Sequence, residues 1–177
     1  MIKKIIKIFA VIGFILGIGS FLLIAVGVNV ISNFIKMDLE PEDIKVPRTQ
    51  AETVIDCVIK QDAEGIQSLF APIITETYDL EKEIEELFQF FKGTILSYDK
   101  PTGKSQTKSK DYDGIIYEES QGRVENVVTD KGYAYHISVN GYYIYRDNAD
   151  YVGVWNIRVV DLDTNYEVSI QIGSDIP

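Results

Sequence analysis

The chain has 177 residues, of which 46% are hydrophobic and 25% are charged, a composition typical of a folded globular protein. Four lysines precede Asp38, so residues 38–177 carry 13 basic against 27 acidic side chains, a net charge of −14. Such a surface repels nucleic acid, because a phosphate backbone binds clusters of Lys and Arg. We therefore exclude nucleic acid as a partner.

The first predicted element is a transmembrane helix. Residues 8–31 contain no charged side chain, and as a helix they span about 36 Å, against about 30 Å for the hydrocarbon core of a bilayer. Lys3, Lys4 and Lys7 precede this run and acidic residues follow it, which predicts a cytoplasmic N-terminus. We expect residues 1–36 to anchor a single-pass protein in the lipid bilayer of the cell membrane.

Two other interpretations of this apolar run are open. Residues 25–27 (Ala-Val-Gly) offer a signal-peptidase site, although the run is longer than the apolar core of about 7 to 15 residues in a signal peptide. Gly13 and Gly17 form a G-x-x-x-G pattern that favours a weak homodimer, although glycine is common in membrane helices in general.

An acidic linker and three helices are expected next. Residues 37–48 contain two prolines and several carboxylates, which predicts an extended linker. Residues 49–177 then form one extracytoplasmic domain. Capping residues precede apolar stripes of helical period at three places. The helices are expected after Thr49, between Asp62 and Pro72, and from Asp79 to Gly93.

The second half of the domain is predicted to be a sheet. Aromatic and β-branched residues dominate after Gly93 and their period falls toward two, which is typical of strands. Gly122 and Gly141 are expected to mark β-bulges, and residues 100–110 are expected to form a loop. The fold class is therefore α+β, with helices on a curved antiparallel sheet. Strands are expected at residues 94–98, 114–128, 132–146, 152–161 and 165–172.

This order of elements resembles a known family. Residues 61–70, residues 87–93, Ser97-Tyr98 and residues 152–155 are similar to segments of an uncharacterised family of bacterial surface lipoproteins. The resemblance covers residues 51–172. It implies a cystatin-like fold, the cone of nuclear transport factor two, scytalone dehydratase and ketosteroid isomerase. The chain lacks the acylated cysteine of that family, and the resemblance supplies no catalytic residue.

The sequence favours no catalytic residue, metal ligand or cofactor. His136 is the only histidine and is expected on the solvent face of its strand, while Cys57 lies far away on the first helix. Neither residue has the partners that nucleophilic chemistry requires. Asp161, Asp163 and Asn165 begin like a calcium loop, but the glycine and the final glutamate of that motif are missing.

Aromatic residues give the one positive indication of a site. Tyr142 and Tyr143 point to opposite faces of one strand, so we expect one to be a core residue and the other to contact a partner. The residues expected at a ligand or partner contact are Tyr142, Tyr143, Tyr145 and Trp155.

We expect a membrane-anchored extracytoplasmic binding module for a protein, a peptide or a small apolar ligand. One version of this hypothesis is an immunity or inhibitor protein. The alternative is a cone-pocket enzyme of the isomerase or dehydratase type, which requires a buried carboxylate beside a Tyr or His at the floor of a pocket.

Overall fold

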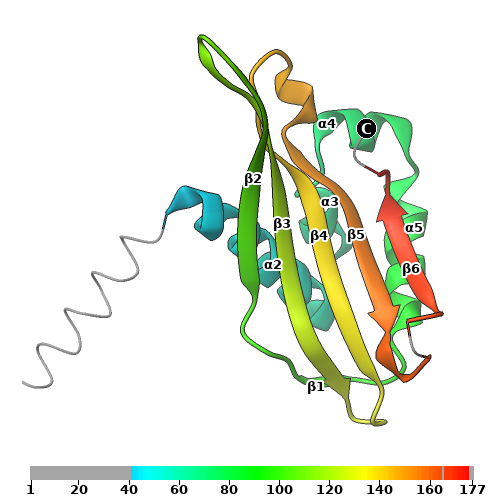
Figure 1. Cartoon of the computed structure of the whole chain (residues 1–177). Coiled ribbons are helices and arrows are strands. Elements are labelled where there is room, and N and C mark those ends of the chain that lie inside the picture. The colour runs from blue at the N-terminus through cyan, green and yellow to red at the C-terminus, as the bar shows by residue number, and fades with distance from the viewer. Residues whose placement is uncertain (1–40, 165, 176–177) are drawn as a thin grey trace, which may run out of the picture. The chain divides into compact units, whose positions relative to one another are not determined.

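The computed structural model describes residues 41–164 and 166–175, and the predicted membrane helix at residues 8–31 lies outside them (Figure 1). The described residues form four α-helices, six β-strands and two short 3-10 helices. The helices are α2 (Glu42–Lys60), α3 (Ala63–Gln67), α4 (Pro72–Thr77) and α5 (Leu80–Phe90), with 3-10 helices η1 (Ala149–Tyr151) and η2 (Leu162–Thr164). The strands are β1 (Ile95–Ser97), β2 (Thr102–Asp111), β3 (Gly114–Thr129), β4 (Ala134–Tyr145), β5 (Gly153–Asp161) and β6 (Ser169–Gly173).

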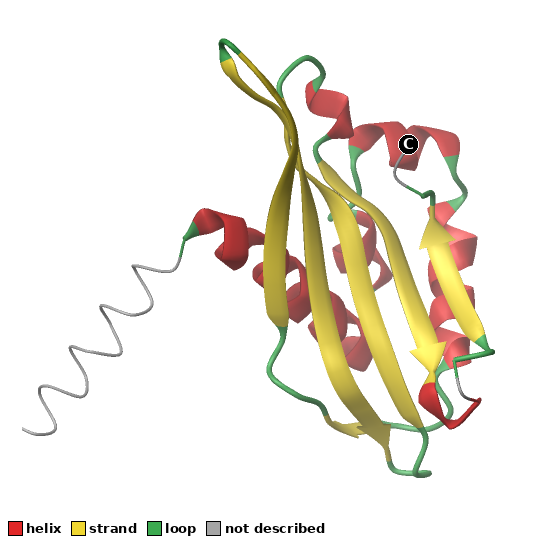
Figure 2. Cartoon of the chain, in the orientation of Figure 1, coloured by secondary structure: helices red, strands yellow, loops and turns green. Residues whose placement is uncertain are grey.

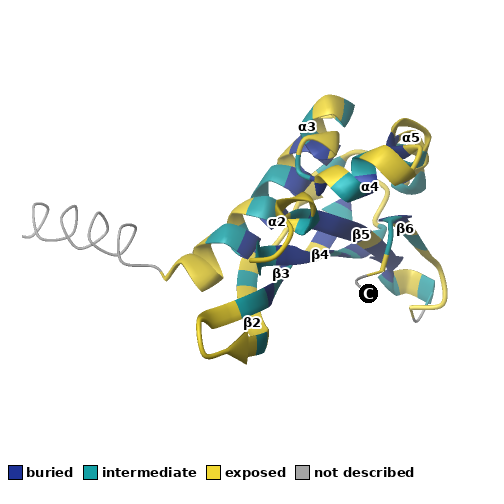
Figure 3. Cartoon of the chain, turned by 90° about the horizontal axis from the view of Figure 1, so that it is seen from above, coloured by how far each residue is buried: buried dark blue, intermediate teal, exposed yellow. Residues whose placement is uncertain are grey.

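The strands form a single antiparallel sheet. Its order is β1-β3-β4-β5-β6, and β2 also pairs with β3, along the part of β3 that β1 leaves free. Figure 2 shows the long strands β3, β4 and β5 side by side, with helices behind them. In the view from above, the four α-helices lie on the same side of the sheet (Figure 3). The sheet therefore has one helix-covered face and one face that no described α-helix covers, called the helix-free face below.

The core lies between the helices and the covered face. Along β4, Tyr135, Ile137 and Val139 are fully buried, while the alternate residues are only partly buried, as the period of two predicts. Helices α2 and α5 supply the opposing apolar side chains, and Figure 3 shows the buried residues gathered between the two layers. Fully buried members of this core include Ala51, Val54, Ile55, Ile84, Leu87, Val124, Val127, Ile157 and Val159.

Two paired glycines let α2 lie directly on the sheet. Gly103 of β2 and Gly122 of β3 are cross-strand partners. A Cβ atom on Gly103 would lie 2.2 Å from the backbone nitrogen of Arg48, and one on Gly122 would lie 2.3 Å from the carbonyl oxygen of Pro47. Gly122 therefore marks a close approach of a helix backbone, and the bulge predicted there is wrong because the register is regular. The register shift predicted at Gly141 is confirmed.

The expected fold class, a transmembrane helix followed by a cystatin-like cone of three helices on an antiparallel sheet, is wrong in its helices, whereas an α+β fold with an antiparallel sheet is observed. The described chain has four helices on a six-stranded sheet, and none of these helices combines the length and apolar character needed to cross a membrane. Pro72 was expected to end a helix, but it begins α4. Proline is well tolerated at the first helical position, because the backbone N–H that it lacks has no partner there.

Two segments expected to lack regular structure are ordered. Helix α2 begins at Glu42, so residues 42–48 of the expected linker are helical, and Pro47 is buried inside the helix. Residues 102–111 form β2 instead of a loop. Their side chains are mostly exposed because β2 is an edge strand, so they lack the apolar alternation by which a strand is recognised.

Candidate functional site

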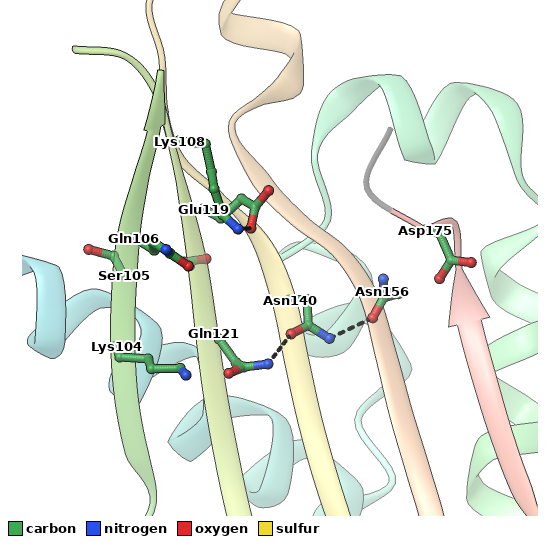
Figure 4. A pocket seen from close by; sticks show the side chains of 10 residues that line it. Lys104, Ser105, Gln106, Lys108, Glu119, Gln121, Asn140, Asn156 and Asp175 are labelled. Carbon is green, nitrogen blue, oxygen red and sulfur yellow. Dashed lines mark hydrogen bonds and ion pairs between the residues drawn. The ribbon is translucent and has the colours of Figure 1, made fainter. Parts of the chain in front are cut away.

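The helix-free face carries rows of polar side chains that run across the strands. Lys104 of β2, Gln121 of β3, Asn140 of β4 and Asn156 of β5 are successive cross-strand partners in one such row. The residues next to them in the sequence face the helices. Gly122 approaches Pro47 of α2, while Val139 and Ile157 are fully buried. Figure 4 shows the row in front of the strands, with helices behind.

Three amides of this row, Gln121, Asn140 and Asn156, are joined by hydrogen bonds and are called the amide row below. Gln121 Nε2 donates to Asn140 Oδ1 at 3.2 Å, and Asn140 Nδ2 donates to Asn156 Oδ1 at 2.9 Å. Asn156 Nδ2 donates to the carbonyl oxygen of Ser174 at 3.1 Å. Each amide group has two N–H donors and two acceptor lone pairs. The chain fixes the orientation of the three amides and leaves further donors and acceptors free for a ligand.

A shallow depression lies over the amide row. Its volume is about 390 Å³, and side chains of β2, β3, β4 and β5 line it, together with Asp175. On its wall, Lys108 Nζ lies 3.1 Å from Glu119 Oε2. A second depression of about 190 Å³ continues along β2 between Lys104 and Arg123. Both depressions are open and lined largely by polar side chains, which suits a ligand with hydrogen-bonding groups.

Five aromatic rings lie beside the amide row and are called the aromatic cluster. Tyr142 packs edge-on against Tyr117, Tyr145 and Trp155, with ring centroids 5.0 to 5.6 Å apart. Tyr145 stacks on Tyr117 at 5.7 Å and on Tyr151 at 4.8 Å. Edge-on and stacked pairs at these distances are mutually attractive. The cluster therefore packs the ends of β3, β4 and β5 together with η1, which carries Tyr151, and no described α-helix covers it.

Tyr142 joins the aromatic cluster to the amide row. Its cross-strand partner is Glu119, which lines the larger depression. Only 3% of Tyr142 is exposed, and burial raises the pKa of its phenol to about 12, with Glu119 adding to the shift. Its hydroxyl has no hydrogen-bond partner among the described residues. Every fully buried side-chain nitrogen or oxygen of these residues does have one, so this hydroxyl is not fully buried. The hydroxyl of Tyr142 therefore remains open to solvent or ligand.

The structure separates the four residues expected at the site. Tyr142, Tyr145 and Trp155 meet in the aromatic cluster. Tyr143 points to the helix side, where its hydroxyl donates to Glu42 Oε2 of α2 at 2.8 Å. The expectation that Tyr142 and Tyr143 face opposite sides is confirmed, and Tyr142 is the buried one.

Several residues of this face were missed from the sequence. Tyr117 enters the cluster because it is the cross-strand partner of Tyr145. The amide row depends on the register of three strands, and two of its members, Gln121 and Asn156, have no unusual sequence context. The alternation of polar residues along β3 and β4 is the signal that could have indicated a polar face.

The only histidine and the only cysteine are apart and engaged elsewhere. His136 Nδ1 lies 2.6 Å from Glu125 Oε2, whose side chain is 46% exposed, so this is not a buried acid–base pair. The Sγ of Cys57 lies 3.9 Å from Asp62 Oδ2, and burial together with the nearby carboxylate raises the pKa of the thiol. A raised pKa disfavours the thiolate, which is the nucleophilic form of cysteine.

Asp161 is the described carboxylate that best matches the enzyme alternative. It is 1% exposed and lies near Tyr135, whose pKa is raised by burial. However, Asp161 Oδ1 accepts the backbone N–H of Asp163, and Oδ2 lies 3.4 Å from Lys92 Nζ. The backbone N–H of Lys92 also donates to the hydroxyl of Tyr135 at 2.9 Å. These contacts tie the end of α5 to β4 and β5, so Asp161 has a structural role.

Within residues 41–164 and 166–175, no three His, Cys, Asp or Glu side chains are grouped closely enough to hold a metal ion. The segment after Asp161 forms η2, with Thr164 Oγ1 donating to the carbonyl oxygen of Asp161 at 2.8 Å.

Comparison with known proteins places the chain in a family. Residues 53–162, from within α2 to the start of η2, match a domain of unknown function (DUF5104), and the chain belongs to this family. The expectation of an uncharacterised family is thereby confirmed. The match carries no information on a lipid anchor or on a cystatin-like fold. No curated protein matches the chain.

Proposed function

We propose that this domain is a binding module and that it contacts its partner through the helix-free face of the sheet. The observation that carries the proposal is the fixed amide row beside the aromatic cluster. Aromatic side chains beside polar groups that are held by hydrogen bonds and can still form more are typical of the centre of a binding surface. Because the strands are held by the core behind them, the surface needs no ordering when a partner binds.

The polar lining supports one of the expected ligand classes over the others. A small apolar ligand needs an enclosed apolar cavity, whereas the depressions on this face are open and lined by Lys, Gln, Asn and Glu side chains. A partner rich in hydrogen-bonding groups fits this lining better. The geometry also favours a binding module over the isomerase or dehydratase alternative, because both oxygens of Asp161 are already engaged.

Site-specific photo-cross-linking on cells tests the proposal. In the full-length chain, a photoreactive residue placed at Gln106, which lines the larger depression, or at Tyr145 of the aromatic cluster lies on the helix-free face (Figure 4). One placed at Lys82 lies on α5, on the other side of the sheet. We expect adducts from Gln106 and Tyr145 and none from Lys82. The same adducts from all three positions, or none from the face, would contradict the proposal.

The expected location outside the cytoplasm stays a prediction from the sequence, as do the immunity role, the lipoprotein relationship and the weak homodimer. Protease added to intact cells tests the location, because it should digest the domain described here. Protection of the domain until the cells are permeabilised would contradict an extracytoplasmic location. A gene for a secreted toxin beside this one would favour the immunity role.

A further inference from the structure

Basic side chains gather on the helix-free face although the domain as a whole is strongly acidic. Residues 100–110 contain four lysines and no acidic residue. Lys104 and Arg123 line the smaller depression on both sides of Gln121, and neither has a carboxylate partner among the described residues. Arg123 instead donates to Oε1 of Gln121 at 3.1 Å. Two cations without a carboxylate partner, on a domain with a net charge of −14, create a local attraction for a negatively charged ligand, although Glu119 and Asp175 line the larger depression nearby.

The amide row adds a second requirement. Gln121 and Asn140 use part of their hydrogen-bonding capacity within the row and keep both donors and acceptors for a ligand, whereas Asn156 is only 6% exposed and holds Asn140 in place. A hydroxyl group is also both a donor and an acceptor, so a ligand with neighbouring hydroxyls matches these amides. Adjacent strands are about 4.8 Å apart, so Gln121 and Asn140 offer two contacts at that spacing to a ligand that crosses the strands.

The aromatic cluster supplies the third element. Tyr145 and Tyr151 are stacked and half-buried in the aromatic cluster, and the hydroxyl of Tyr142, the cross-strand partner of Glu119, lacks a partner among the described residues. The face of an aromatic ring carries negative charge and attracts polarised C–H groups. A sugar ring offers such C–H groups on its faces and hydroxyls on its rim.

We infer that the helix-free face recognises an acidic carbohydrate, meaning a glycan that carries carboxylate or phosphate groups. This inference rests on the proposed function and names its ligand class. The cations would hold the acidic groups, the amide row the hydroxyls, and the half-buried rings of the aromatic cluster the C–H groups on the sugar faces. An acidic peptide fits the centre of this face less well, because peptides bind sheets through a free strand edge, and the open edge of β2 lies beside the amide row and not within it.

Binding of the purified full-length chain to four polymers tests the inference. The probes are polygalacturonate and phosphomannan as acidic glycans, dextran as a neutral glycan and polyglutamate as an acidic peptide. We expect measurable binding to at least one acidic glycan, and at least tenfold weaker binding to dextran and polyglutamate. Binding should weaken as salt is added, because free cations contribute to it.

Matched variants locate the binding. Replacing Lys104 and Arg123 by Gln removes the free cations, and Gln121→Ala removes one member of the amide row; each change should weaken binding about tenfold. Asn140→Leu should do the same, and melting curves show whether each variant is folded. Lys82→Gln removes an exposed cation from α5 and should leave binding unchanged.

Three outcomes overturn the inference. Binding to polyglutamate as tight as to the acidic glycans would mean that charge alone is recognised. An equal loss in Lys82→Gln and in the Lys104 and Arg123 variant would mean that binding is non-specific. A failure of both acidic glycans to bind, with cross-links still concentrated on the helix-free face, would exclude the glycan and leave the binding module standing.

Discussion

The two faces of the sheet are stabilised in different ways. The helix-covered face is lined by fully buried residues such as Ile137 and Ile157, and α2 and α5 shield them from water. The helix-free face carries amides and cations on the same strands, one residue away. Its single apolar region, the aromatic cluster, is buried by its own members, with Tyr142 enclosed by its neighbours.

This difference separates stability from binding along each strand. Substitutions toward the helices should lower the free energy of unfolding, and substitutions on the polar rows should change binding alone. The aromatic cluster is where the two roles meet.

The largest effect is expected at Tyr142. Tyr142→Ala removes a ring that contacts three others and should lower the free energy of unfolding by about 3 to 4 kcal/mol, as for other buried aromatics. Its neighbour Tyr143 makes one hydrogen bond at the rim, so Tyr143→Phe should cost about 1 kcal/mol or less. Urea denaturation measures both. Equal losses would show that the cluster does not stabilise the helix-free face.

The next-largest loss of stability is expected at Gly122 of β3, and its neighbour Gln121 serves as the comparison. Gly122→Ala places a methyl group 2.3 Å from the carbonyl oxygen of Pro47, so α2 must move, and we expect a loss of about 2 kcal/mol. Gln121→Ala on the opposite face should change stability by no more than about 0.5 kcal/mol. Thermal melting of both variants gives the comparison. A Gly122→Ala protein as stable as the wild type would contradict the close contact with α2.

The third prediction concerns the ionisation of Tyr142. Its pKa is raised from 10.0 to about 12, so burial favours the protonated phenol in the folded state. This stabilising contribution is fully present below pH 10 and is lost as the pH rises through about 12. Tyrosinate absorbance should show a late step that Tyr142→Phe removes. Tyr142→Phe should keep neutral-pH stability within about 0.5 kcal/mol, because the hydroxyl has no partner to lose.

The smallest effect is expected at the tip of the β2–β3 hairpin. Arg146 of the segment after β4 forms two hydrogen bonds of 2.8 Å to Asp111, which lower the pKa of that carboxyl group from 3.8 to about 2. The resulting stabilisation is present above pH 3.8 and is lost as the pH falls through about 2. Arg146→Gln should return the Asp111 pKa toward 3.8 in an NMR titration. An unchanged value would mean that the pair does not form in solution.

The sequence predicts those parts of the fold that local patterns determine. The period of two placed β3, β4 and β5 within one or two residues, and the capping aspartate at residue 62 correctly began α3, where its side chain accepts from Gly65 N. The pattern failed at α4 and β2. Proline can either end a helix or begin one, so Pro72 alone does not show which of the two occurs. An edge strand exposed along its length, such as β2, shows no apolar alternation.

The candidate site could be predicted only in part. Three of the four expected aromatic residues meet, because they lie on two neighbouring strands. Tyr117 and the amide row could not be found, because their contacts depend on pairing between residues about 20 positions apart along the chain, and on register shifts beside Glu119 and Gly141. A shift of one residue would move every side chain beyond it to the other face.

The lysines of β2 also bear on how the protein avoids self-association. Among the described strands β2 pairs with β3 alone, so its outer backbone N–H and C=O groups form an open edge. An open edge invites another chain to add a strand, the first step toward edge-to-edge aggregation. Lys104, Lys108 and Lys110 stand along this edge, and a strand added there would have to strip water from their ammonium groups. The same residues that give the face its local positive charge therefore keep its edge solvated at high local concentration.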